Sequence, residues 1–215
     1  MLFVFLKIQL LNQIKLIDLN FISRFKTNTK YKKSYQNTKA SYLRRIRWAV
    51  AMFYFGMGLC FATWASRIPD IKTMLQLGEA ELGTILFAVP LGQLVVMPFS
   101  GKIVTRFGSH RVLLFSLFFY AFSLTNIGLA AASWQLSLAL FLFGISGNLA
   151  NIAVNTQGVY TEVLFKKTIM SSFHGMWSFA GFTGALVGLG MLTLKFSPYK
   201  HFLIVGFIVI LIMIF

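Results

Sequence analysis

Six long segments of this 215-residue chain contain no Asp, Glu, Lys or Arg. A helix needs about twenty apolar residues to cross the roughly 30 Å hydrocarbon core of a bilayer. A single charge at the middle of such a helix costs about 2.5–3.5 kcal/mol on insertion scales. We therefore predict an all-α integral membrane bundle with five complete transmembrane helices and a truncated sixth. The predicted spans are 48–65, 82–100, 112–132, 136–158, 172–194 and 202–215.

The composition argues against the common soluble classes. Only 12% of the residues are charged, whereas an average soluble domain has roughly 25%. The net charge of +15 would suggest nucleic acid in a soluble protein, but here the bases lie between apolar segments or near the N-terminus. A membrane β-barrel would need alternating segments, and FSLFFYAF (115–122) does not alternate. We expect no nucleic-acid partner and expect the bases to meet an anionic lipid surface.

The Lys and Arg residues also predict the orientation. Residues 1–47 contain eleven of them, and the connections 101–111 and 159–171 contain five more. With these three regions in the cytoplasm, only four bases remain on the other side, in agreement with the positive-inside rule. Residues 1–47 are predicted to be a separate basic cytoplasmic extension. It is either an amphipathic helix on the membrane surface, a disordered tail, or an extension translated from an upstream start codon.

Residues suited to catalysis or metal binding are scarce. Cys60 is the only cysteine, and His110, His174 and His201 are far apart in sequence. No HExxH, CxxC, GxSxG or P-loop pattern occurs. We therefore expect no enzymatic activity, no metal site and no cofactor.

The connection GKIVTRFGSHRV (101–112) combines glycines with bases. In order, it contains Gly101, Arg106, Gly108 and Arg111. Glycines permit a tight turn, and guanidinium groups bind carboxylates through paired donors. Glu162, in the next cytoplasmic connection, is the expected acidic partner. The alternative is that these bases only anchor the turn on the cytoplasmic side.

This motif resembles the loop between the second and third helices of major facilitator superfamily transporters, although Thr105 stands where that family usually has Asp. The segments FATWASRIPDIK (61–72), NLANIAVNTQG (148–158) and SSFHGMWSFAGFTGALVG (171–188) resemble an uncharacterised bacterial branch loosely related to sugar permeases. The resemblance covers about residues 46–215 and implies the N-terminal six-helix half of a carrier. It also implies a bacterial inner (plasma) membrane, and a loop that latches the two halves together on the cytoplasmic side.

Polar residues inside the predicted spans are candidates for a solute site. Asn148, Asn151 and Asn155 share one helix face, and the resemblance implies that helices one and four line the cavity. Either they bind a polar solute, or they form helix–helix hydrogen bonds worth about 0.6 kcal/mol on average. Tyr54 and Trp64 are further solute candidates, and the interfacial aromatic belt is the alternative for Trp64. His174 is a candidate proton sensor, with a structural histidine as the alternative.

The implied function is transmembrane transport of a small polar solute by alternating access. The expected partners are that solute and the lipid bilayer, together with either a missing C-terminal half or a second copy in a homodimer. The last apolar segment, 202–215, is short for a span. A truncated carrier fragment without transport activity therefore remains an alternative.

Overall fold

The computed structural model of the chain describes residues 29–214. The predicted N-terminal extension up to residue 28, and Phe215 at the end of the last predicted span, lie outside these described residues. Within them every regular element is a helix, which confirms the all-α class. In chain order the helices are α2 (Thr29–Ala65), α3 (Ile68–Met74), α4 (Glu79–Leu86), α5 (Ala88–Phe107), α6 (Ser109–Ile127), α7 (Ser133–Phe165), α8 (Met170–Thr193) and α9 (Pro198–Ile214).

Among the described residues, five helical stretches are long and apolar enough to cross a membrane. These are Lys39–Ala65, Glu79–Phe107, Ser109–Ile127, Ser133–Phe165 and Met170–Thr193. Pro198–Ile214 is a shorter apolar helix. The prediction of five complete spans and a shorter sixth is confirmed by length and composition.

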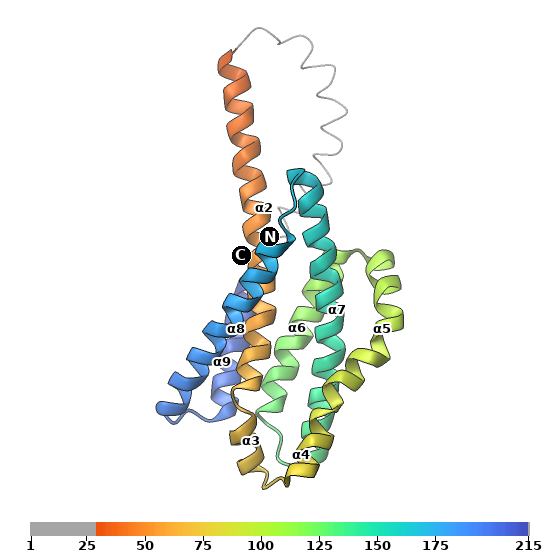
Figure 1. The fold of residues 1–215 in the computed structure, drawn as a ribbon, viewed down its shortest axis with the longest axis vertical. Coiled ribbons are helices and arrows are strands. Elements are labelled where there is room, and N and C mark those ends of the chain that lie inside the picture. The colour runs from red at the N-terminus through yellow and green to blue at the C-terminus, as the bar shows by residue number, and fades with distance from the viewer. Residues whose placement is uncertain (1–28, 215) are drawn as a thin grey trace.

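Helix α2 starts well before the predicted span at residue 48. Residues 29–47 contain no Gly or Pro that would interrupt a helix, so the backbone hydrogen bonds continue through the position where the apolar segment begins. At 1.5 Å per residue, this part of α2 adds about 28 Å to the helix. Figure 1 shows this end of α2 reaching beyond the other helices. The boundary predicted at residue 47 is therefore not a break in the backbone.

The second predicted span is built from α4 and α5, which are separated at Phe87. Pro90 lies in the first turn of α5 and has no N–H to donate to the carbonyl of Leu86, four residues earlier. Pro98 lies inside α5. Close packing against α7 depends on glycine: a Cβ at Gly92 would meet the carbonyl oxygen of Phe141. The two backbones can approach each other here only because that Cβ is absent.

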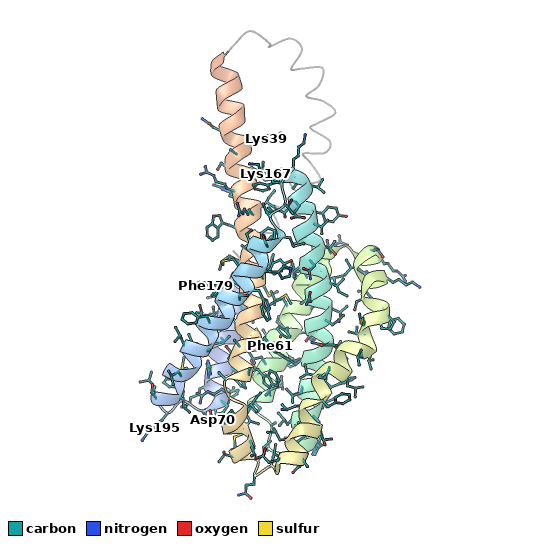
Figure 2. All side chains as sticks on the ribbon, viewed as in Figure 1. Lys39, Phe61, Asp70, Lys167, Phe179 and Lys195 are labelled. Carbon is teal, nitrogen blue, oxygen red and sulfur yellow. The ribbon has the colours of Figure 1, made fainter. Side chains whose placement is uncertain are left out.

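Large apolar side chains cover the outside of the bundle. Helix α2 is the most buried of the candidate spans and α8 is the least buried. Phe179 of α8 is 57% exposed and points away from the bundle (Figure 2). In water such a surface would be unfavourable, so this arrangement agrees with a protein whose outer face contacts lipid.

Candidate functional site

A cavity of about 230 Å³ lies between α2, α7 and α8. Its lining residues are Tyr54 and Met57 from α2, Asn151 and Val154 from α7, and His174 and Trp177 from α8. Three of the residues predicted from the sequence, Tyr54, Asn151 and His174, therefore meet at one place. Binding pockets for drug-sized ligands span about 300–1,000 Å³, so this cavity suits a small molecule.

Tyr54 forms a fixed wall of the cavity. Its side chain is buried, and its ring stacks on Phe173 with the centroids 5.5 Å apart. The hydroxyl donates a hydrogen bond to the Oδ1 atom of Asn155 over 2.7 Å. His174 approaches the same ring edge-on, with the centroids 5.4 Å apart. Tyr54 therefore links the first span to α7 and α8 and holds Asn155 in place.

The three asparagines on α7 have different neighbours. Asn148 accepts a hydrogen bond from the Ser100 hydroxyl of α5 over 2.7 Å, so its side chain joins two helices. Asn155 donates to both the backbone carbonyl and the side-chain Oδ1 atom of Asn151. Asn151 is exposed at the cavity. Its Oδ1 atom accepts from Asn155, and its own amide N–H groups form no hydrogen bond among the described residues, so these groups are available to a solute as donors.

Trp177 is a further aromatic residue at the cavity, and the sequence interpretation missed it. It is 39% exposed and follows His174 by three residues, and this spacing on one helix face was the available signal. The predicted Trp64 does not line this cavity. It is buried at 7% exposure, and its ring lies 5.9 Å from that of Phe143. Burial inside the bundle also argues against the interfacial belt for Trp64, because the side chain packs against α7.

The glycine and arginine turn has a defined geometry. Gly108 has φ of +83° between α5 and α6, a conformation that favours glycine, whereas Gly101 is helical within α5. Arg106 and Arg111 are exposed, and the Arg106 guanidinium lies 5.5 Å from the centre of the Phe107 ring. The structure thus brings the motif residues together at one end of the bundle with both guanidinium groups accessible.

Glu162 does not form the expected contact with these arginines. Its Oε1 atom accepts hydrogen bonds from the backbone N–H groups of Ile169 and Met170, over 2.6 and 2.8 Å. The first N–H groups of a helix have no partner within that helix and attract a carboxylate. Glu162 reaches the start of α8 across a short connection, so it stabilises that helix end instead of pairing with the turn.

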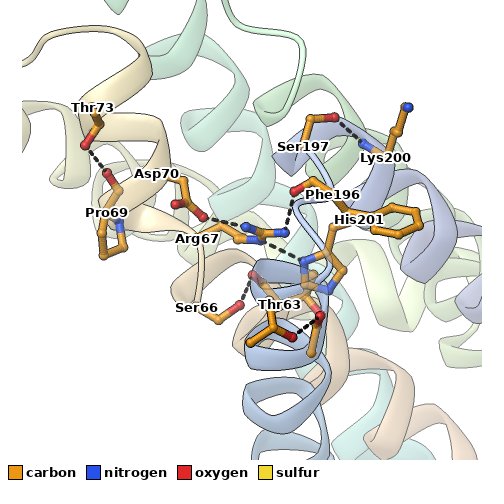
Figure 3. A network of polar contacts seen from close by, with 12 residues as sticks. Thr63, Ser66, Arg67, Pro69, Asp70, Thr73, Phe196, Ser197, Lys200 and His201 are labelled. Atoms are coloured by element: carbon orange, nitrogen blue, oxygen red, sulfur yellow. Dashed lines mark hydrogen bonds and ion pairs between the residues drawn. The ribbon is translucent and has the colours of Figure 1, made fainter.

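A second polar cluster, also missed from the sequence, is centred on Arg67, just beyond the C-terminal end of α2, and Figure 3 shows its contacts. Arg67 is only 1% exposed. It forms an ion pair with Asp70 at 2.6 Å and donates to the Nδ1 atom of His201 over 3.2 Å. It also donates to the backbone carbonyl of Phe196 over 2.8 Å. The sequence signal was an Arg and an Asp three residues apart beside a helix-starting proline, but the contacts with α9 could not be read from it.

The sequence is similar to those of several bacterial membrane proteins. No family model matches the chain. The chain is 32% identical over 155 residues to the uncharacterised transporter y4wD of Sinorhizobium fredii, which is 72% of this chain and 41% of the relative. It is 30% identical over 149 residues to an uncharacterised MFS-type transporter of Yersinia pestis, covering 69% of this chain and 38% of the relative. It is 31% identical over 141 residues to the membrane protein MosC of Rhizobium meliloti, covering 66% and 34%. The chain thus spans between about a third and two fifths of the length of these relatives.

Proposed function

Because this chain is homologous to transporters of the major facilitator superfamily, we propose that it forms one helical half of a secondary carrier. In this proposal the carrier moves a small polar solute across the bacterial inner membrane by alternating access, with its N-terminus in the cytoplasm. The observation that supports it best is the cavity shared by α2, α7 and α8. No catalytic step is assigned to any residue.

The chemistry of the cavity supports a neutral polar solute. Its polar lining groups are an amide, a phenol, an imidazole and an indole N–H, and none of the six lining residues is Asp, Glu, Lys or Arg. Asn151 offers N–H donors, while Trp177 offers an exposed aromatic face. A hydroxylated ring such as a sugar has hydrogen-bonding edges and apolar faces that match this pairing. We assign solute contact to Asn151, with Asn155 and Tyr54 as the groups that orient it.

Two of the predicted solute residues receive other roles in this proposal. Asn148 joins α7 to α5 through Ser100, and Trp64 packs in the core against Phe143. His174 remains a candidate proton sensor, because it is exposed at the cavity and in contact with the Tyr54 ring.

The cavity needs a second wall for alternating access. We propose that another helical unit covers the exposed faces of α5 and α8, either a further part of the same protein or a second copy of this chain. Arg106 and Arg111 would then bind acidic groups of that unit on the cytoplasmic side, since Glu162 is engaged at the start of α8. Cys60 is fully buried, so a cross-linking test needs an introduced thiol on the cavity side of α8, such as Gly181→Cys one turn after Trp177, where there is open space. Cross-linking to a second copy supports the homodimer.

The decisive experiment measures uptake of a panel of labelled sugars and polyols by membrane vesicles containing the protein. For the solute that is transported, Asn151→Leu should lower uptake about tenfold, which corresponds to one lost hydrogen bond of about 1.4 kcal/mol. Asn126→Leu is the matched control. Asn126 lies on α6 and bonds to the carbonyl of Phe122 in its own helix, so this change should leave uptake unaltered. Equal uptake by the Asn151→Leu and Asn126→Leu proteins would show that Asn151 does not contact the solute. No uptake of any solute would favour a fragment without transport activity.

A further inference from the structure

One end of the bundle is basic and contains very little acid. The exposed bases at this end are Lys39, Arg44, Arg45, Arg47, Lys102, Arg106, Arg111, Lys166 and Lys167. Glu162 is the one acid there among residues 29–214, and the backbone of α8 occupies its carboxylate. Figure 2 shows Lys39 and Lys167 at this end, with Asp70 and Lys195 at the other.

The densest part of this basic surface is the α2 segment formed by Arg44, Arg45, Arg47 and Trp48. All four side chains are exposed, and Trp48 is 63% exposed. On a helix, Arg44, Arg47 and Trp48 lie at positions i, i+3 and i+4 and share a face. The uncharged run of the first span begins at Trp48 itself. In the proposed orientation, these residues therefore lie where the hydrocarbon of the bilayer meets its headgroups.

The arginines of this segment have little to bind within the protein. The ion pairs of the described residues are Arg67–Asp70 and Lys72–Glu79, both at the other end of the bundle. Arg47 donates one hydrogen bond, from Nη2 to the Ser172 hydroxyl over 3.2 Å. A guanidinium has five N–H donors, so most of its donors still face outward. The contact with Ser172 also ties this part of α2 to the start of α8.

We propose that Arg44, Arg45, Arg47 and Trp48 form a binding site for the headgroup phosphate of an anionic phospholipid. Guanidinium groups bind phosphate oxygens in pairs, and tryptophan is enriched at the boundary between acyl chains and headgroups. The position of Trp48 at the start of the uncharged run favours a lipid over free phosphate or nucleic acid. This site is independent of the transport proposal, because it lies outside the cavity.

The test uses the purified protein in a neutral detergent. Native mass spectrometry would count bound phosphatidylglycerol and phosphatidylcholine and give a Kd for each lipid. Each base near an anionic surface contributes a factor of about five, so Arg44→Gln with Arg45→Gln should weaken phosphatidylglycerol binding about 25-fold. Lys195→Gln with Lys200→Gln is the matched control, since it removes the same charge from exposed sites at the other end. It should change the Kd less than twofold. Arg47→Gln alone provides a second variant, with an expected loss of about fivefold.

Three results would overturn the site. Equal binding of phosphatidylglycerol and phosphatidylcholine would show that the headgroup charge is not recognised. Equal losses in the two double variants would show that only the overall charge matters. Displacement of phosphatidylglycerol by millimolar inorganic phosphate would show that the site takes the free anion instead of the lipid. Preferential phosphatidylglycerol binding that weakens in the arginine variants alone supports the proposal, whether or not the protein transports a solute.

Discussion

Replacing Arg67 by Met gives the sharpest test of how the end of the bundle opposite Lys167 is held together. Arg67 is buried and contacts Asp70, His201 and the Phe196 carbonyl. The substitution keeps an unbranched apolar stem of similar reach but removes every donor. It leaves the Nδ1 atom of the fully buried His201 without its partner, together with one backbone carbonyl and one carboxylate.

The expected loss follows from these three contacts. A buried acceptor left unsatisfied costs about 1–3 kcal/mol. The Asp70 side chain is 30% exposed, so water can hydrate it and its ion pair contributes less than a buried pair would. We expect Arg67→Met to lower the free energy of unfolding by about 3 kcal/mol. For a protein of this size, that corresponds to a decrease of about 6–12 °C in the apparent melting temperature. His201→Leu should cost less than Arg67→Met, because it removes one contact, and Asp70→Asn should also cost less, because its amide oxygen can still accept a hydrogen bond from Arg67.

Thermal unfolding in detergent, compared among variants at one heating rate, checks this order. Lys200→Ala is the control, since Lys200 is exposed on the first turn of α9 close to His201 and its loss should stay within about 0.5 kcal/mol. Combining Arg67→Met with His201→Phe should cost less than the two single changes added together, because both partners of one bond are replaced. An Arg67→Met protein as stable as the Lys200→Ala control would falsify the reasoning, and so would Asp70→Asn as the most damaging change.

Three further predictions test the packing, the helix end and the turn. Gly92→Ala should destabilise by about 1–3 kcal/mol through overpacking against α7, whereas Gly101→Ala in the same helix has open space around it and should be neutral or stabilising. The reverse order in thermal unfolding would contradict the packing described here. Glu162→Ala should lower the free energy of unfolding by about 1 kcal/mol and speed amide exchange at Met170. Glu162→Gln keeps an acceptor and should lower the stability less. Unchanged amide exchange in Glu162→Ala would argue against this capping role. Arg106→Ala should lower the maximal uptake rate more than it changes the KM, and an effect on KM alone would argue against a latch.

The spans were predictable from the sequence because charge in hydrocarbon is costly wherever it occurs along the chain. That rule identifies the segments without any knowledge of their neighbours. The same rule says less about where a helix begins or ends. Helix α2 already includes the basic residues before Trp48, because backbone hydrogen bonds form there whether or not the side chains are charged. Helix periodicity likewise put Asn148, Asn151 and Asn155 on one face, although it did not separate their roles.

The partners of polar side chains depended on contacts between distant segments. Asn148 meets Ser100 across 48 positions, and Asn155 meets Tyr54 across 101. Glu162 accepts hydrogen bonds from backbone N–H groups at the start of α8. A prediction based only on charged side chains does not include such backbone donors. Trp177 faces the cavity while Trp64 packs in the core, although both are tryptophans near apolar residues.

The sequence by itself determined which segments are apolar, their number and the charge difference between their two ends, because these follow from local composition and the cost of burying charge. The tertiary structure alone decided which polar groups meet, including the cavity around Asn151 and the contacts of Arg67. Hydrogen bonds act over about 3 Å between particular atoms, and only the packing of α2, α7, α8 and α9 brings those atoms within that distance.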